Sequence, residues 1–515
     1  MHQAEIIVLL FAAVAALAVL AHKISPPYPI VLVLGGLALS FVPGLPAVQL
    51  NPDIVLYFIL PALIYPAALF TSWRDFRRNL RAILLLAIGL VLATTLAVAW
   101  IAHSIEAALP WAAAFALGAI VSPPDAVAAT AIIRRLGVPH RIQVILEGES
   151  LVNDATALVA LQFAIAAVVT GTFSPAHATA RFVWAAAGGI GFGLLVGVTM
   201  RWVQSHLDNP PAYLPAEHMH ASGVLATVAA GIFLGWHSPL MITARTRLQA
   251  YAFWETIVFL LNGFVFIVIG LQLPRILHAW NRASLTGALM SAIVICAMVI
   301  LVRFAWVIPA VYLSRLLRSE RQVRDPTPSW QHVAIVGWAG MRGVVSLAAA
   351  FALPLALPTG RPFPGRDYIL FVAFSVILVT LVLQGLTLPV LIRKLRVPPD
   401  AQTDEEERLA RLEANKAALE WIQEARAKSN FSPDAVDRLR TEYDERIEQL
   451  ERCADNPDDC RGEIATPQYQ RLQHQALRVE RKTIIRLRNE RVINDDALRR
   501  IQRDLDLAEA RLTGG

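Results

Sequence analysis

Apolar segments long enough to cross a membrane recur along the first three quarters of the chain, and they restrict its fold more than any other feature. A helix needs about 20 apolar residues to cross the ~30 Å hydrocarbon core of a bilayer. Such segments recur between residues 5 and 392. Of the 515 residues, 56% are hydrophobic and only 17% are charged, a balance too apolar for a soluble protein of this length. The chain is therefore predicted to be an all-α polytopic membrane protein.

The number of spans depends on one irregular region, residues 204–237. The predicted spans outside it are 5–21, 28–43, 53–70, 81–102, 110–133, 144–170, 181–203, 251–273, 285–314, 331–357 and 367–391. Inside the irregular region, only 222–236 is clearly apolar. We therefore expect 12 or 13 spans in a transmembrane domain over residues 1–397. Residues 398–515 are charged and helix-forming, and are predicted to be a cytoplasmic helical tail.

Arginines in the short loops predict how the spans are oriented. A loop with Arg74, Arg77, Arg78 and Arg81 precedes residues 103–110, which lack lysine and arginine, and a loop with Arg134, Arg135 and Arg141 follows. Basic loops stay in the cytoplasm, so the N-terminus is expected outside and the tail inside. Because Arg201 and Arg245 are then both inside, the stretch between them crosses twice or not at all. The net charge of +6 reflects this topology, and no nucleic-acid partner is expected.

Two adjacent prolines interrupt the predicted span 110–133. Pro123 and Pro124 remove two backbone donors and clash with the preceding turn, so the helix is expected to unwind from Ser122 to Asp125. Unwound backbone exposes carbonyl oxygens, and these oxygens and a carboxylate are hard ligands of the kind that sodium prefers. The alternative interpretation is a simple bend with Asp125 as a helix cap.

The following span carries two polar stripes. Ser150 and Asp154 are four residues apart and share one helical face, whereas Glu149 and Asn153 share another. Carboxylates inside a span are costly, so they are candidates for function. We assign Ser150 and Asp154 to the cation, and Glu149 and Asn153 to structural support. Arg342, in a glycine-rich late span, is the expected partner of Glu149.

At these motifs the chain resembles the bacterial sodium/proton exchangers of the cation:proton antiporter superfamily, in the NhaP and eukaryotic-exchanger branch. Ser122-Pro-Pro-Asp125, Glu149-Ser-Leu-Val-Asn-Asp154, Ser222-Gly-Val-Leu-Ala226 and Gly340-Met-Arg-Gly343 have the family's order and spacing. The resemblance covers residue 5 to about residue 395. It implies an inverted-repeat antiporter with broken helices at the midplane, a core and a dimerisation domain, a homodimer, and alternating access.

The resemblance also implies the site. The cation and the proton are expected to bind at Asp154, Asp125, Ser150 and the backbone carbonyl of Pro124. Na+ itself is expected to be held by Asp125, Ser150 and Asp154. Glu149, Asn153 and Arg342 form the structural network. Two features depart from the family: Pro124 stands where many relatives have threonine, and residues 207–217 are shorter than the span that similar proteins have there.

The predicted function is exchange of a monovalent cation, Na+ first, for H+ across the bacterial inner membrane, with both ions competing for Asp154. The Asn153–Asp154 pair resembles the electroneutral branch. A K+/H+ antiporter of the same fold is the main alternative, followed by a cation channel and an intramembrane enzyme. Residues 148–151 lack the second glycine of a nucleophile elbow and the histidines lack metal-ligand spacing, so neither catalysis nor a cofactor is expected. The expected partners are the lipid bilayer and a second copy; the tail's partner is unknown.

Overall fold

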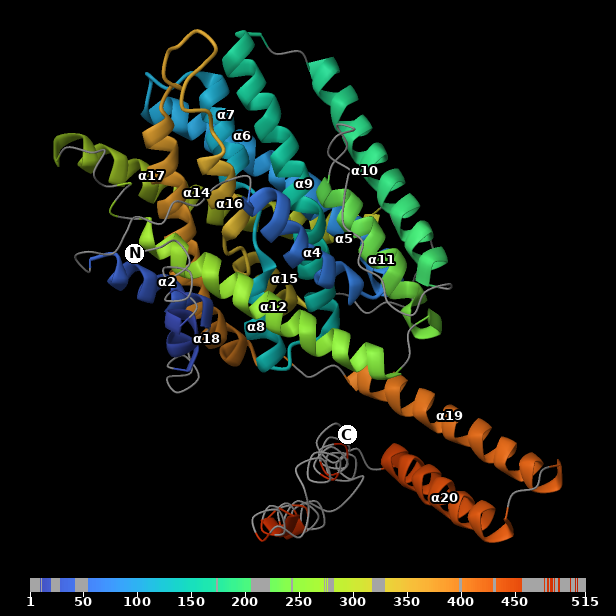
Figure 1. Ribbon diagram of the computed structural model, residues 1–515. Coiled ribbons are helices and arrows are strands. Elements are labelled where there is room, and N and C mark those ends of the chain that lie inside the picture. The colour runs from blue at the N-terminus through green and yellow to red at the C-terminus, as the bar shows by residue number, and fades with distance from the viewer. Residues whose placement is uncertain are drawn as a thin grey trace. The chain divides into compact units, whose positions relative to one another are not determined.

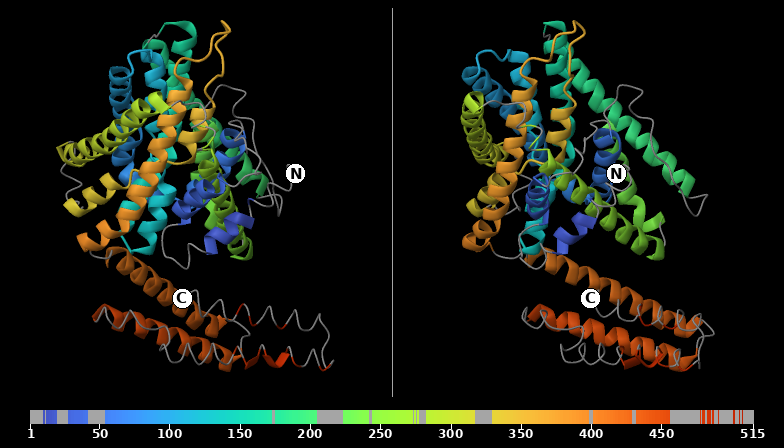
Figure 2. Two further views of the ribbon diagram at one scale, coloured as in Figure 1. Left: turned by 90° about the vertical axis from the view of Figure 1, so that its left-hand side faces the viewer. Right: turned by 60° about the vertical axis from the view of Figure 1, so that its left-hand side comes forward.

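The computed structural model describes most of the chain in two packed units (Figures 1 and 2). The described residues are 10, 12–19, 28–41, 54–172, 175–204, 223–241, 244–272, 274, 276, 282–316, 329–397, 401–428, 432–455 and isolated positions from 477 to 507. Packing contacts cluster within two units, Met1–Pro399 and Asp400–Gly515.

The first unit is built from helices. They include α2 (Tyr28–Leu39), η1 (Val55–Ile59), α4 (Leu60–Leu69), α5 (Trp73–Leu84), η2 (Leu85–Leu90), α6 (Val91–Ile105), α7 (Trp111–Val121), α8 (Ala126–Arg135), α9 (His140–Thr170), α10 (Pro175–Gln204), α11 (Gly223–Met241), α12 (Ala244–Leu271), α14 (Arg282–Leu316), α15 (Trp330–Trp338), α16 (Val344–Phe351), α17 (Arg366–Val379), η5 (Thr380–Gln384) and α18 (Gly385–Leu395). Seven described helical segments are long and apolar enough to cross a membrane, and three shorter ones are apolar. The all-α polytopic fold is confirmed.

One predicted loop is a helix. The arginines of residues 71–80 predict a cytoplasmic loop there, but helix α5 begins at Trp73. The hydroxyl of Ser72 caps this helix by accepting a hydrogen bond from the backbone N–H of Asp75. Phe76 and Asn79 are buried on its inner face, whereas Arg77 is exposed. The helix is amphipathic, so the mean hydropathy of its residues conceals its apolar side.

The irregular region is described only in its second half, where α11 is a helix. Residues 205–222, and with them the short stretch 207–217, lie outside the described residues. Helices α10 and α11 lie side by side (Figure 1). Gly193 packs on Ala226 and Gly197 on Phe233, so the two helices run in the same direction.

Both broken helices lie in the interior. Helix α7 ends at Val121 and α8 begins at Ala126, which confirms the unwinding predicted at the two prolines. The span predicted over 331–357 is also broken, since α15 ends at Trp338 and α16 starts only at Val344. No proline marks this second break; the glycines at 340 and 343 permit it.

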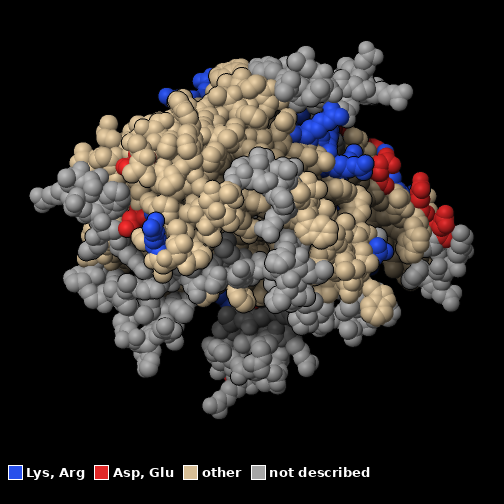
Figure 3. Space-filling view, turned by 90° about the horizontal axis from the view of Figure 1, so that it is seen from above, with Lys and Arg blue, Asp and Glu red and all other residues tan. Residues whose placement is uncertain are grey.

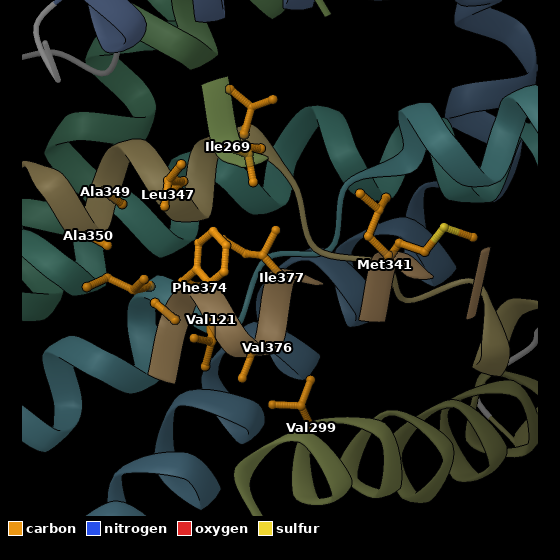
Figure 4. Packing of buried hydrophobic residues seen from close by; sticks show 14 of the residues in the cluster. Val121, Ile269, Val299, Met341, Leu347, Ala349, Ala350, Phe374, Val376 and Ile377 are labelled. Carbon is orange, nitrogen blue, oxygen red and sulfur yellow. The ribbon is translucent and has the colours of Figure 1, made fainter. Parts of the chain in front are cut away.

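Buried apolar side chains enclose the second break (Figure 4). Met341 in the unwound stretch is fully buried, as are Phe374 and Ile377 of α17 and Ile269 of α12. Val121, the last residue of α7, belongs to the same cluster. The unwound backbone is thus shielded from lipid, as non-helical backbone at membrane depth requires.

The second unit begins with a helical hairpin of α19 (Ala401–Lys428) and α20 (Pro433–Asp455), which lie side by side in Figure 2. Arg408 donates to the carbonyl oxygen of Leu450 at 3.0 Å, and Lys416 pairs with Glu451 at 2.9 Å. Arg408 also donates to both oxygens of Glu405 and holds the pKa of that carboxyl below its ordinary value. Charged side chains are sparse over most of the described surface in Figure 3.

Helices α2 and α12 approach each other so closely that two glycines are required. A Cβ at Gly36 would lie 2.2 Å from the carbonyl oxygen of Ile267, and one at Gly270 would lie 2.2 Å from that of Val33. In contrast, a Cβ at Gly191 of α10 would meet nothing within 4 Å.

We therefore expect Gly36→Ala to destabilise the protein by about 1–3 kcal/mol, because the added methyl group forces the two backbones apart. Thermal unfolding of the purified protein in detergent measures the change. Gly191→Ala is the matched control and should be neutral or stabilising, since it gains helix propensity without a clash. Equal unfolding temperatures for both variants would contradict this account of the contact.

Candidate cation-binding site

The site is built where the two unwound stretches meet. The backbone N–H of Asp125, in the first break, donates to the carbonyl oxygen of Met341, in the second, at 2.7 Å. Each stretch thereby satisfies a backbone group that its own helix leaves unpaired. The two breaks are consequently held together by the chain itself.

The Asp125 carboxylate sits at the starts of two helices. It accepts hydrogen bonds from the backbone N–H of Val127 in α8, at 2.8 Å, and from that of Val344 in α16. The positive ends of two helix dipoles therefore face one carboxylate. A Cβ at Gly343 would lie only 1.8 Å from this carboxylate, so the position has to be glycine. The cap considered for Asp125 is real, and it coexists with the break.

Helix α9 brings the other predicted residues to this crossing. The Asn153 amide donates to the carbonyl oxygen of Pro124 at 2.7 Å, and the Ser150 hydroxyl lies 3.4 Å from the backbone nitrogen of Ala126. Asp154 is 7% exposed and lies within electrostatic range of Asp125. The Pro124 carbonyl is thus already engaged by Asn153. Ser150 and Asn153 therefore contact the backbone of the first break, and Asp154 lies near Asp125.

Glu149 has a different partner from the one expected. Arg303 of α14 donates to both of its carboxylate oxygens, at 2.7 and 2.9 Å, and both side chains are 1% exposed. The Arg303 Nε also donates to the carbonyl oxygen of Val336, at 3.0 Å. The predicted pairing of Glu149 with Arg342 is therefore wrong. The charge of Arg303 inside the apolar span 285–314 marks it as a second candidate partner in the sequence, but does not distinguish it from Arg342.

Arg342 is fully buried in the second break, next to this pair. Its backbone N–H donates to the hydroxyl of Thr380 at 3.1 Å, but its three guanidinium nitrogens have no hydrogen-bond partner among the described residues. The side chain lies within electrostatic range of Glu149 and Arg303. Its side chain therefore adds positive charge to the site without forming a hydrogen bond to a described residue.

We expect Arg303→Met to destabilise the protein by about 3–5 kcal/mol, because it leaves the Glu149 carboxylate buried and unpaired. Arg342→Met should cost less, since it removes no side-chain hydrogen bond. Thermal unfolding in detergent compares the two variants. Adding Glu149→Gln to Arg303→Met should restore part of the loss. A larger loss for Arg342→Met than for Arg303→Met would refute this assignment.

Known proteins share this sequence and fold. The family model described as sodium/hydrogen exchanger, transmembrane, matches residues 8–394. An uncharacterized Na+/H+ exchanger of Mycobacterium tuberculosis is 37% identical over 98% of this chain and 96% of its own length. The sodium, potassium, lithium and rubidium/H+ antiporter of Bacillus subtilis is 34% identical over 86% of this chain and 69% of its own.

Among solved structures, the chain is similar in fold to the sodium proton antiporter MjNhaP1 from Methanocaldococcus jannaschii. The TM-score is 0.60 at 19% identity, covering 76% of this chain and 97% of that one. The family model and the mycobacterial relative cover nearly the whole transmembrane unit, and the fold agrees with them. The chain belongs to the sodium/hydrogen exchanger family.

Proposed function

We propose that this protein is a secondary antiporter that exchanges Na+ for H+ across the bacterial inner membrane by alternating access. The observation that carries the proposal is the pair of carboxylates, Asp125 and Asp154, at the crossing of two broken helices. Asp125 is held by two backbone N–H groups, whereas no ion pair or hydrogen bond is found for the Asp154 side chain within the described residues. Asp154 is therefore the group that can exchange a proton for a cation.

The charges at the site support one cation per proton. The charged residues in and around the site are the carboxylates Asp125, Asp154 and Glu149 and the guanidinium groups of Arg303 and Arg342. With all five ionised, the site carries one net negative charge. Either one Na+ or one H+ neutralises it, so the loaded site has the same charge in both directions of transport. Electroneutral exchange follows from this balance.

Potassium is the second candidate, because the site's ligands are oxygens, which bind either ion. The relative from Bacillus pumilus that is 37% identical over 72% of this chain is named as an antiporter of sodium, potassium, lithium and rubidium. Purified protein in liposomes with an internal pH dye, challenged with Na+, Li+, K+ and choline, ranks the ions. Ion flux without a counter-moving proton would identify a channel instead.

The assembly and orientation are part of the same proposal. The transmembrane domain over 1–397 forms a homodimer in the bilayer, as the family resemblance implies, with the N-terminus outside. The tail over 398–515 lies in the cytoplasm and regulates transport or assembly. The division of the chain into Met1–Pro399 and Asp400–Gly515 supports separate units. Transport itself needs no cofactor and no catalytic residue.

We expect Asp154→Asn to abolish exchange, because an amide neither releases a proton nor supplies the charge that binds Na+. In the wild type, apparent Na+ affinity should weaken about tenfold per pH unit below the pKa of the site, since the proton and the cation compete. Dye-loaded liposomes measure both effects. Glu255→Gln is the control, because Glu255 is an exposed carboxylate on α12, and should leave exchange unchanged. Exchange by Asp154→Asn at the wild-type rate would disprove the mechanism.

We expect a chain that stops after Val397 to retain proton-coupled Na+ flux, since all the residues of the site precede that point. The pH at which transport is half-activated, or the strength of the dimer, should change. Flux in liposomes and mass photometry of the detergent-solubilised protein measure these properties. If the shortened chain is folded, as judged by its unfolding temperature, but carries no flux, the tail is part of the transport machinery.

A further inference from the structure

A large apolar cavity lies beside the site, between α5, α9, α10 and α11. Its volume is about 540 Å³, within the range of small-ligand pockets. Its walls include Phe76 of α5, Val152 and Thr156 of α9, Leu194 of α10 and Phe233 of α11. Apart from the Thr156 hydroxyl, the side chains of these five residues are hydrocarbon. A polar or charged ligand would lose its hydration there without compensation.

The cavity opens at the exposed surface of two apolar helices. Ile190 is 45% exposed, Leu194 42% and Trp236 57%, and all three line the cavity. On α11 the wall extends from Leu225 to Trp236, about 16 Å at the rise of a helix. That length is about half of the ~30 Å hydrocarbon core, which is the depth of one leaflet. The dimensions suit one acyl chain.

One end of the cavity is basic. Gly235 of α11 packs on the backbone of Leu69, four residues before Trp73, so the wall residues Trp73 and Trp236 lie at the same end. Tryptophans of this kind favour the membrane–water interface. Arg74 and Arg77 are exposed in the first turns of α5, beside this end, and make no ion pair with described residues.

We propose that this cavity binds one acyl chain of an anionic phospholipid, whose phosphate is held by Arg74 and Arg77. Its hydrophobic walls accept the chain, and its basic end accepts the negative headgroup, to which each arginine near a membrane surface contributes attraction. The proposal does not depend on which ion is transported.

The bound chain touches the helix that carries the site. Val152 and Thr156 of α9 face the cavity, while Asn153 and Asp154 of the same helix face the crossing. The lipid therefore fills the space between α9 and the pair α10 and α11. Any movement of α9 against that pair has to displace or compress the lipid, so its occupancy sets the rate of such movement.

Photo-crosslinking tests the proposal on the full chain. The protein is reconstituted with phosphatidylglycerol that carries a diazirine at mid-chain, and labelled peptides are identified by mass spectrometry. Labels are expected on α10 and α11 where these helices line the cavity. Ala186→Phe and Ala229→Phe narrow the cavity and should abolish these labels. Ala187→Phe, on the exposed side of α10, is the matched control and should not.

The headgroup is tested separately. Arg74→Gln and Arg77→Gln should each lower capture about fivefold. Arg393→Gln and Lys394→Gln, at the exposed end of α18, remove charge elsewhere and should leave capture unchanged. A phosphatidylcholine probe should be captured less, and free glycerol phosphate should not compete, because it lacks the chain.

Three outcomes would overturn the proposal. Labelling that survives both cavity-filling variants would place the lipid elsewhere. Equal capture of phosphatidylcholine would remove the role of the arginines. Crosslinks to a second copy of the chain from a photo-reactive residue at position 229, without lipid labelling, would assign the cavity to the dimer contact.

Discussion

The hydrogen bond between the Asp125 N–H and the Met341 carbonyl is the interaction on which the rest of the structure depends. Unwound backbone inside a membrane is tolerated only when its polar groups are paired within the protein. Here the first break supplies the backbone N–H of Asp125, and the second supplies the carbonyl oxygen of Met341. The same contact brings the starts of α8 and α16 to one carboxylate, so a structural necessity and a charged site arise together.

A second constraint is the balance of buried charge. A carboxylate or guanidinium inside a span costs several kcal/mol unless it is paired. Glu149 and Arg303 meet this requirement with two short hydrogen bonds at 1% exposure. Arg342 has no such bond among the described residues, and the carboxylate that acts on its charge is the nearby Glu149. Glu149 and Arg303 thus satisfy each other, whereas Asp154 has no such partner among the described residues.

Much of the candidate site could be predicted because each member carries its own signal. Pro123 and Pro124 indicate a break in the helix, and a carboxylate within a span, such as Asp154, indicates a functional residue. The partner of Glu149 could not be chosen this way, because Arg303 and Arg342 are both arginines within spans. The position of the second break could not be predicted either, since glycines permit unwinding without requiring it. The sequence predicts a loop where α5 lies, because the arginines of this segment outweigh its buried face in the mean hydropathy.

The sequence by itself determined that the chain spans a membrane many times, where the first helix breaks, and which family it belongs to. These properties depend on local composition and on residues close together along the chain. Only the tertiary structure decided that Arg303 pairs with Glu149, that Gly343 faces Asp125, and that a cavity lies behind α9. Those facts depend on which helix faces touch, and helices in an apolar surrounding are selected by close packing and by charge pairing between distant segments. The pattern of residues along one helix does not show which faces of distant helices will touch.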